Sequence, residues 1–361
     1  MTFTETPSTA PTDPGGGLNL TTNKFDRKKN LAVLGAAVVV GALTWIPSGA
    51  VNWARWVFVT AAVYCVAVYV VARLVEGRRA GTDRAMAAIV TCAFVLVAAP
   101  LVSLLYTVVR EGSKRFDSEF FTETMRGVAG EGGGAYHAII GTLIITGLAA
   151  LMSVPFGLFT AIYLAEYGHG TKLAKGIQSM VDVMTGIPSI VAGLFAYALF
   201  ELWWGPGTRS GISGAVALTV LMTPVVVRSA EEMLRLVPNE LREASYALGV
   251  PKWKTIVKVV LPTAIAGLIT GIVLAIARVI GETAPLLVTA GLAQGVNWNP
   301  FNGRMTTLPV YTYYQYVQPG VPPESGQERA WSAALALIII VMILFSAARI
   351  LSSVLKPKGL R

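Results

Sequence analysis

The stretch VVLPTAIAGLITGIVLAIARVIGETAPLLV, residues 259–288, is almost entirely apolar and is long enough to cross a lipid bilayer as a helix. Of the 361 residues in the chain, 54% are hydrophobic and 14% are charged, whereas about a quarter of the residues in a soluble domain are charged. Similar apolar stretches recur along the chain. We therefore predict an all-α, polytopic integral membrane protein of about eight transmembrane helices.

The expected spans are separated by short polar segments. Lys and Arg concentrate in alternate connecting segments, and such residues accumulate on the cytoplasmic side of a membrane. The pattern therefore predicts a multi-pass protein with both termini in the cytoplasm. The approximate spans are 31–48, 54–73, 86–109, 137–164, 178–203, 212–227, 259–288 and 331–351.

Three regions differ in composition. Residues 1–30 are rich in Thr, Pro and Gly at their start and are expected to form a disordered cytoplasmic tail. Residues 31–85 form an accessory transmembrane hairpin that ends in a polar linker, Glu76 to Arg84. Residues 86–361 form the working core, with a large cytoplasmic loop at 228–258.

Several classes of function are disfavoured. The net charge of +9 is spread over short basic runs between apolar stretches and does not form an aromatic-studded patch, so no nucleic-acid partner is expected. Cys65 and Cys92 lie in apolar stretches, so a structural disulfide is not expected. His137 and His169 are expected in loops or interfaces and are too separated to hold a metal. No G-x-x-x-x-G-K-[ST] loop occurs. We expect no enzyme, catalytic residue, metal or cofactor.

The loop at 228–258 contains helix signals. Ser229 and Glu232 have the spacing of a capping box, so either a short helix starts there or the preceding span continues. Asn239 is a second candidate N-cap, Gly249 suits a left-handed C-terminal position, and Pro251 prevents the helix from resuming. These residues predict a helix of about ten residues.

Small side chains leave part of the surface of this helix without protruding groups. Ala244, Ser245 and Ala247 would let another protein approach closely. The alternative is a connector lying flat on the lipid surface, anchored by Trp253 and the lysines around it.

Two charged residues interrupt the apolar stretch 259–288. Arg278 and Glu282 are four residues apart, which places them on one face of a continuous helix. That face carries the small residues Gly267, Gly271 and Ala275, so we expect both charges to point into the protein. An ionisable residue at membrane depth indicates function. The alternative is an internal salt bridge that holds helices together.

A guanidinium group matches the oxygens of phosphate or carboxylate two at a time. Glu282, an acceptor when ionised, would favour a substrate that still carries a proton, such as hydrogen phosphate. Arg228 lies at the inner end of the span 212–227 and is a third candidate for the substrate path, or an arginine whose head reaches the lipid interface.

The loop resembles a known motif. Glu243-Ala244-Ser245, Gly249 and Leu261-Pro262 have the spacing of the EAA loop of ABC-importer permeases, with Ser245 and Val259 in place of the usual Ala and Ile. The resemblance implies that the short helix fits a cleft on a separate ATPase, with Glu243, Ala244, Ser245 and Gly249 at the joint.

The core resembles the PstA-type permeases of phosphate-specific ABC importers. The resemblance is carried by ARVIGETAPLL (277–287), GIPSIVAGLF (186–195) and TPVVVR (223–228). It implies a type I importer core of six spans in the bacterial cytoplasmic membrane, preceded here by the extra hairpin, with Arg228, Arg278 and Glu282 along the phosphate path. The implied partners are a PstC-type permease, two PstB-type ATP-binding subunits and an external PstS-type phosphate-binding protein.

Other functions are weighed beside this one. The chain could import another oxyanion, could be a channel or a proton-coupled carrier outside the ABC class, or could be a membrane scaffold. The external segment 291–329 is rich in aromatic residues, including Trp298, Tyr311 and Tyr316. It would suit docking of an external binding protein, or would form an interfacial aromatic belt.

Overall fold

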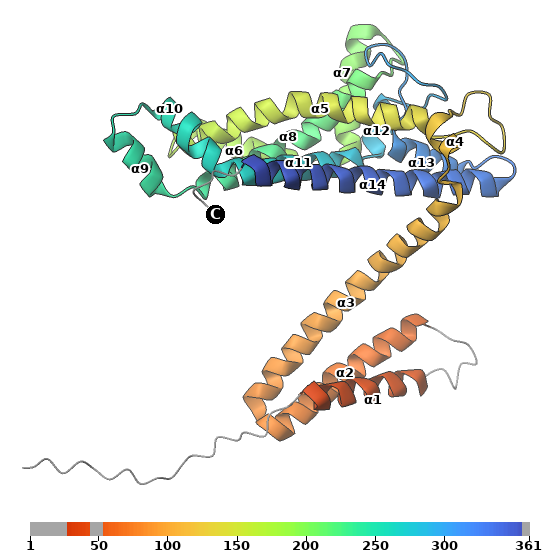
Figure 1. The fold of residues 1–361 in the computed structure, drawn as a ribbon, viewed down its shortest axis with the longest axis vertical. Coiled ribbons are helices and arrows are strands. Elements are labelled where there is room, and N and C mark those ends of the chain that lie inside the picture. Colours follow the sequence, from red (N-terminus) through yellow and green to blue (C-terminus); the bar gives the residue numbers. More distant parts are fainter. Residues whose placement is uncertain (1–26, 44–52, 356–361) are drawn as a thin grey trace, which may run out of the picture. The chain divides into compact units, whose positions relative to one another are not determined.

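The computed structural model describes residues 27–43 and 53–355, in which every regular element is helical. The expected tail therefore lies outside the described residues, except for its last few positions, which begin helix α1. The chain divides into two compact units, Met1–Leu104 and Leu105–Arg361. The division falls inside a long helix, α3 (Arg78–Gly112), drawn in orange in Figure 1.

Unit 1 contains α1 (Arg27–Leu43), α2 (Trp53–Glu76) and the first part of α3. The linker expected at 76–84 is mostly helical, because only Gly77, with φ +95°, separates α2 from α3. Arg84 turns back to Glu76, with Nε 2.6 Å from the carboxylate. The Sγ atoms of Cys65 and Cys92 lie 3.8 Å apart as free thiols.

Unit 2 is a bundle of long helices with α9 and α10 at one end and α4 and α13 at the other (Figure 1). We call these the α9 end and the α13 end. After α3 its elements are a 3₁₀ turn (Ser113–Arg115), α4 (Ser118–Thr122), α5 (Tyr136–Ile162), the π-helical turn η3 (Tyr163–Tyr167), α6 (Lys172–Thr185), α7 (Ser189–Trp204), α8 (Gly211–Arg235), α9 (Asn239–Ala247), α10 (Lys252–Thr255), the π-helical turn η4 (Ile256–Val260), α11 (Leu261–Ile280), α12 (Ala284–Thr289), α13 (Leu308–Val317) and α14 (Pro323–Leu355).

Helix α8 is the centre of this bundle and packs against α5, α7, α11 and α12. Glycines permit the close approach of its neighbours: Gly157 of α5 lies against Val226, and Gly271 of α11 lies against Ser229. The largest apolar core joins α5, α8, α11 and α12, with Leu218 and Met222 of α8 fully buried. The small-residue stripe expected along 267–275 therefore does mark a helix contact.

Six described helices are long and apolar enough to cross a membrane, and α6 with α7 makes a seventh if the bent pair is one span. The chain is thus a multi-pass membrane protein, as predicted. The expected span 31–48 appears as a shorter apolar helix, Asn30–Leu43, and its last residues lie outside the described range.

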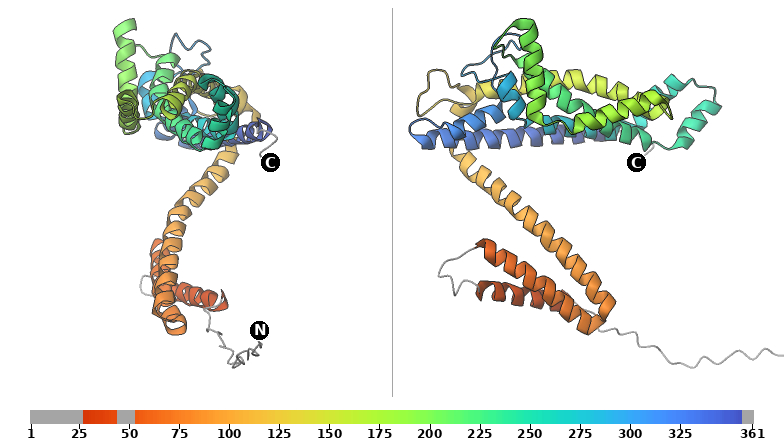
Figure 2. Two further views of the ribbon diagram at one scale, coloured as in Figure 1. Left: turned by 90° about the vertical axis from the view of Figure 1, so that its left-hand side faces the viewer. Right: turned by 180° about the vertical axis from the view of Figure 1, so that it is seen from behind.

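Two expected spans are broken. The stretch 178–203 bends by 105° between α6 and α7, and Figure 2 shows α7 directed steeply away from α6. Pro188 explains the bend, because proline lacks an amide hydrogen and keeps the preceding residue out of helical geometry. The stretch 259–288 ends as a helix at Ile280 and resumes at Ala284.

Candidate functional site

The loop 228–258 is built on α8, which continues without a break to Arg235. The capping-box spacing at Ser229 therefore does not start a new helix, and the alternative of a continuing span is correct. Helix α9 follows over Asn239–Ala247 and ends as predicted at Gly249, whose φ is +73°. The Gly249 amide donates to the Tyr246 carbonyl at 2.9 Å, which closes the last turn.

The start of α9 differs from the prediction. The cap position is Pro238 rather than Asn239, and no side chain caps the helix. Because the φ of proline is fixed, Pro238 can lead the chain into the helix without a side-chain hydrogen bond. Glu240 lies in the first turn, where its charge is favourable to the helix dipole.

Ser245 does not belong to the exposed surface of α9. It is 8% exposed, and its hydroxyl lies 2.8 Å from the hydroxyl of Thr255 in α10. The residue therefore fastens α9 to α10, which corrects the prediction that it leaves a low docking surface. The exposed side of α9 contains Glu243, Ala244, Tyr246, Ala247 and Leu248.

A buried ion pair holds α9 to the rest of unit 2. Arg242 Nη2 lies 2.8 Å from Glu166 Oε1, and the two side chains are 14% and 4% exposed. Arg242 also donates to the carbonyl oxygens of Leu234 at 2.8 Å and Val237 at 2.5 Å. Glu166 lies in the π-helical turn after α5, so one guanidinium group joins the ends of α5 and α8 to the start of α9.

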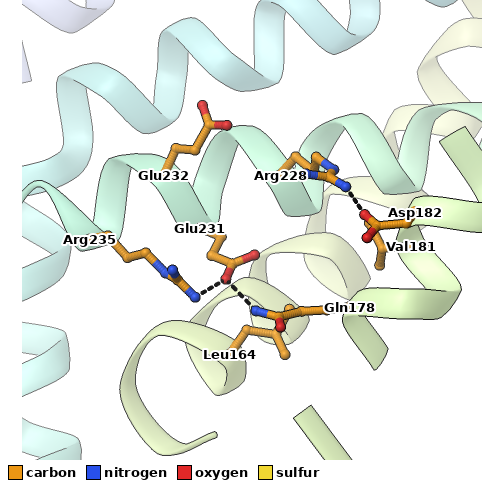
Figure 3. Close-up of a pocket in the computed structure, with 8 residues that line it drawn as sticks. All are labelled: Leu164, Gln178, Val181, Asp182, Arg228, Glu231, Glu232 and Arg235. Atoms are coloured by element: carbon orange, nitrogen blue, oxygen red, sulfur yellow. Dashed lines mark hydrogen bonds and ion pairs between the residues drawn. The ribbon is translucent and has the colours of Figure 1, made fainter. Parts of the chain in front are cut away.

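Arg228 lies on α8 and faces α6 across a polar cavity of about 310 Å³ (Figure 3). Its guanidinium is paired with Asp182 of α6, and both side chains are about half exposed. Glu231, one turn further, accepts from Gln178 at 3.1 Å and from Arg235 at 2.5 Å. The predicted site residue Arg228 is thus held by a carboxylate in this structure.

Arg278 and Glu282 do not share one continuous helix, contrary to the prediction. Helix α11 ends at Ile280, and Glu282 lies in the three-residue break before α12. Gly281 and the Ala284-Pro285 step account for the break, since proline is favoured at the first positions of a new helix. The Glu282 amide still donates to the Val279 carbonyl at 3.1 Å, so the chain turns tightly here.

The expected inward direction of the two charges is also wrong for the single chain. Arg278 is exposed and Glu282 is half-buried, whereas Ala275 on the expected common face is fully buried. Within residues 27–43 and 53–355, neither charged group makes a hydrogen bond or an ion pair, so the salt bridge that would hold helices together is not formed.

Two of the sequence motifs meet in space. Gly193 of α7 lies against Pro285 of α12, where an added Cβ would be 2.6 Å from the Pro285 Cα. The stretch 186–195 therefore supports the segment 281–285 that contains Glu282. On the other side, Gly267 lies against Met233 and Gly271 against Ser229, so α8 and α11 run antiparallel.

This arrangement separates Arg278 from Arg228. Since Gly271 is level with Ser229, Arg278 lies about two turns, or roughly 10 Å, further along α11 in the direction of the α13 end. Arg228 therefore lies nearer the α9 end, and Arg278 and Glu282 lie further along the bundle toward the α13 end.

The chain matches a known family over residues 153–358: the binding-protein-dependent transport system inner membrane component. The chain belongs to this family. It is 49% identical over 258 residues to the phosphate transport system permease protein PstA 1 of Mycobacterium tuberculosis (strain CDC 1551 / Oshkosh), covering 71% of this chain and 83% of the relative. It is 40% identical over 247 residues to the phosphate transport system permease protein PstA of Pasteurella multocida, covering 68% and 86%.

Among solved structures, the fold resembles the MetNI methionine ABC transporter in inward facing conformations, with a TM-score of 0.51 and 22% identity, covering 61% of this chain and 95% of that one. The predicted fold class of a type I importer permease is confirmed. Residues 153–358 of this binding-protein-dependent transport permease include α6 to α13 and every candidate site residue.

Sequence reasoning missed Glu166, Arg242 and Asp182. Glu166 had a usable signal, because it is an ionisable residue at the end of an apolar span, the same criterion that selected Arg278. Asp182 had the same signal, because it lies inside the expected span 178–203. Arg242 had none, because its partner lies far away in the sequence. The aromatic segment needs a correction as well: Tyr311 is 1% exposed and cannot contact a docked protein, whereas Trp298 and Tyr316 are exposed.

Proposed function

We propose that this chain is the membrane permease subunit of an ATP-driven phosphate importer. It would form the translocation path with a second, PstC-type permease, rest on two PstB-type ATP-binding subunits, and receive phosphate from an external PstS-type binding protein. The names of its relatives supply the cargo, and the family supplies the type of transport. The proposal places the protein in the bacterial cytoplasmic membrane with both termini inside.

The exposed guanidinium of Arg278 carries this proposal. It lies on an apolar span and has no partner within residues 27–43 and 53–355. A charge facing lipid at this depth is costly, so such residues are found facing a protein interior or a water-filled path. A second permease packed on this face would enclose Arg278 between the two subunits. Its guanidinium could then bind the oxygens of an oxyanion.

Arg228 would act at a second position of the same path. Asp182 holds its guanidinium here, so an anion would have to displace a carboxylate to bind. We infer that Arg228 accepts phosphate only when α6 and α8 separate. The path would thus be closed to anions at Arg228 in the present arrangement.

Coupling to the ATPase would use the exposed side of α9. Leu248 is 83% exposed, and Leu241 and Tyr246 are each 41% exposed. These residues lie on a short helix that the Glu166–Arg242 pair fastens to α5 and α8. Exposed large apolar side chains on one short helix at an aqueous end favour a protein interface. A partner that pushes on α9 would therefore move α5 and α8. ATP hydrolysis belongs to that partner, and this chain makes and breaks no bond in phosphate.

The test is phosphate uptake in cells that carry Arg278→Gln or Glu282→Gln, with assembly followed by copurification of the ATPase. Uptake should fall at least tenfold in Arg278→Gln while the ATPase still copurifies. Arg349→Gln is the matched control, because it removes the same charge from the exposed side of another apolar span, α14, and should leave uptake unchanged.

Two results would count against the proposal. If Arg278→Gln transports phosphate normally, the chain is a scaffold or uses another path. If sulfate or molybdate competes with phosphate as well as phosphate itself does, the cargo is a different oxyanion.

A further inference from the structure

A cavity of about 210 Å³ at the α13 end contains a buried arginine. Its walls come from the segment between α4 and α5, the first turn of α5, the segment after α12, and helices α13 and α14. Arg329 of α14 lines it and is 3% exposed. This site is distinct from the Arg228 cavity, which lies near the α9 end.

Arg329 is bonded only to neutral groups. Nη1 donates to the carbonyl oxygens of Gly130 at 2.7 Å and Gly132 at 2.9 Å, and Nε donates to Gln315 Oε1 at 3.1 Å. Over the described ranges, no Asp or Glu forms an ion pair with it, and Nη2 has no partner. A buried charge without a counter-charge is strongly unfavourable, so a negative group from outside this chain would stabilise it.

The rest of the cavity is suited to a negative group. None of its lining residues is acidic, and Gln294, Gln315 and Gln318 add amide donors. His137 and Tyr311, 3% and 1% exposed, line it as well. Nδ1 of His137 and the hydroxyl of Tyr311 have no hydrogen-bond partner. Buried polar atoms are nearly always paired, and exceptions indicate a missing water, ion or ligand. His137 was expected in a loop or an interface, and the structure instead buries it here.

We propose that the Arg329 cavity binds a small inorganic oxyanion, hydrogen phosphate in the working transporter, with Arg329 as the charged ligand and neutral amides around it. The choice of phosphate rests on the proposed function. It also rests on the proposed orientation with both termini in the cytoplasm, in which the α13 end faces the outside of the cell. Phosphate released by the external binding protein would then occupy this cavity before it reaches Arg278. The free energy of binding would come from completing the coordination of Arg329.

Gln315→Glu tests the site without removing the arginine. The new carboxylate would take the place of the amide oxygen 3.1 Å from Arg329 Nε and would supply the missing counter-charge internally. Gln327→Glu is the matched control, because Gln327 lies in α14 two residues before Arg329, is exposed, and does not line the cavity. Both variants change the net charge equally.

The measurement is equilibrium binding of radioactive inorganic phosphate to the purified intact complex without ATP or binding protein. Phosphatidylcholine nanodiscs keep lipid phosphodiesters present throughout, so saturable binding reports free phosphate. An Arg278→Gln background removes the contribution of the proposed path. We expect saturable binding in this background and with Gln327→Glu, and binding at least tenfold weaker with Gln315→Glu.

Other outcomes would overturn the inference. If Gln315→Glu binds phosphate as Gln327→Glu does, or if the Arg278→Gln background binds none, the cavity is not an anion site and Arg329 serves only to hold the Gly130–Gly132 segment. Failure of the proposed function would look different, because phosphate uptake by cells would then be insensitive to Arg278→Gln whatever the binding assay gives.

Discussion

Replacing Glu166 by Ala should release α9 from the bundle. The change leaves the Arg242 guanidinium, 14% exposed, opposite an apolar methyl group. Breaking a buried ion pair from one side costs about 3–5 kcal/mol. The lower end applies here, because Arg242 keeps the carbonyl oxygens of Leu234 and Val237 as acceptors and some water reaches it. Local opening of α9 should therefore become about 10²-fold more frequent, since 1.36 kcal/mol corresponds to a factor of ten.

The assay is amide hydrogen exchange of residues 239–247 in the purified complex, read beside ATP-driven phosphate uptake. Protection should fall by about two powers of ten, and uptake should fall with it. Arg235→Ala is the control, because it breaks the more exposed Arg235–Glu231 pair, which contributes at most about 1 kcal/mol. The exchanged pair Glu166→Arg with Arg242→Glu should not restore protection, because a carboxylate at 242 would face the Leu234 and Val237 carbonyls. A change of less than about threefold in Glu166→Ala would refute this role of the pair.

Three further substitutions test single contacts. Gly249→Ala forces a left-handed conformation on alanine at a cost of about 1–2 kcal/mol and should reduce phosphate uptake. Gly170→Ala is its control, because Gly170 has a similar φ of +75° and equally open space around it, and it should leave uptake unchanged. Gly193→Ala places a methyl 2.6 Å from the Pro285 Cα and should lower both the melting temperature and uptake, whereas Gly147→Ala, with no atom within 4 Å, should be neutral or stabilising. Ser245→Ala removes the Thr255 hydrogen bond and should reduce the free energy of unfolding by about 1 kcal/mol, measured by thermal denaturation of the complex.

Local signals in the sequence were sufficient for most of the membrane spans and for the C-terminus of α9. Gly249 and Pro251 determine that helix end through backbone geometry alone, so no tertiary information was needed. The break after Ile280 was readable in principle from Gly281 and Pro285, but the apolar composition of 259–288 favoured one continuous helix. The small-residue stripe at Gly267 and Gly271 did predict packing against another helix.

Long-range pairings could not be predicted in the same way. Nothing near Ser245 indicates that it turns toward Thr255, and nothing near Arg242 points to Glu166, because each orientation depends on how helices pack. The direction of the Arg278 side chain shows the same limit. It was predicted from the positions of residues around an ideal helix. Those positions do not tell whether a helix face packs within the chain or would pack against a partner subunit.

ATP-coupled phosphate import can be measured in proteoliposomes that contain the reassembled complex, the external binding protein and radioactive phosphate. Uptake should require ATP on the side of α9 and should be lost in Gly249→Asp, because the altered loop no longer transmits movement from the ATPase. Uptake that proceeds without ATP, or that Gly249→Asp leaves intact, would instead indicate a channel or a proton-coupled carrier.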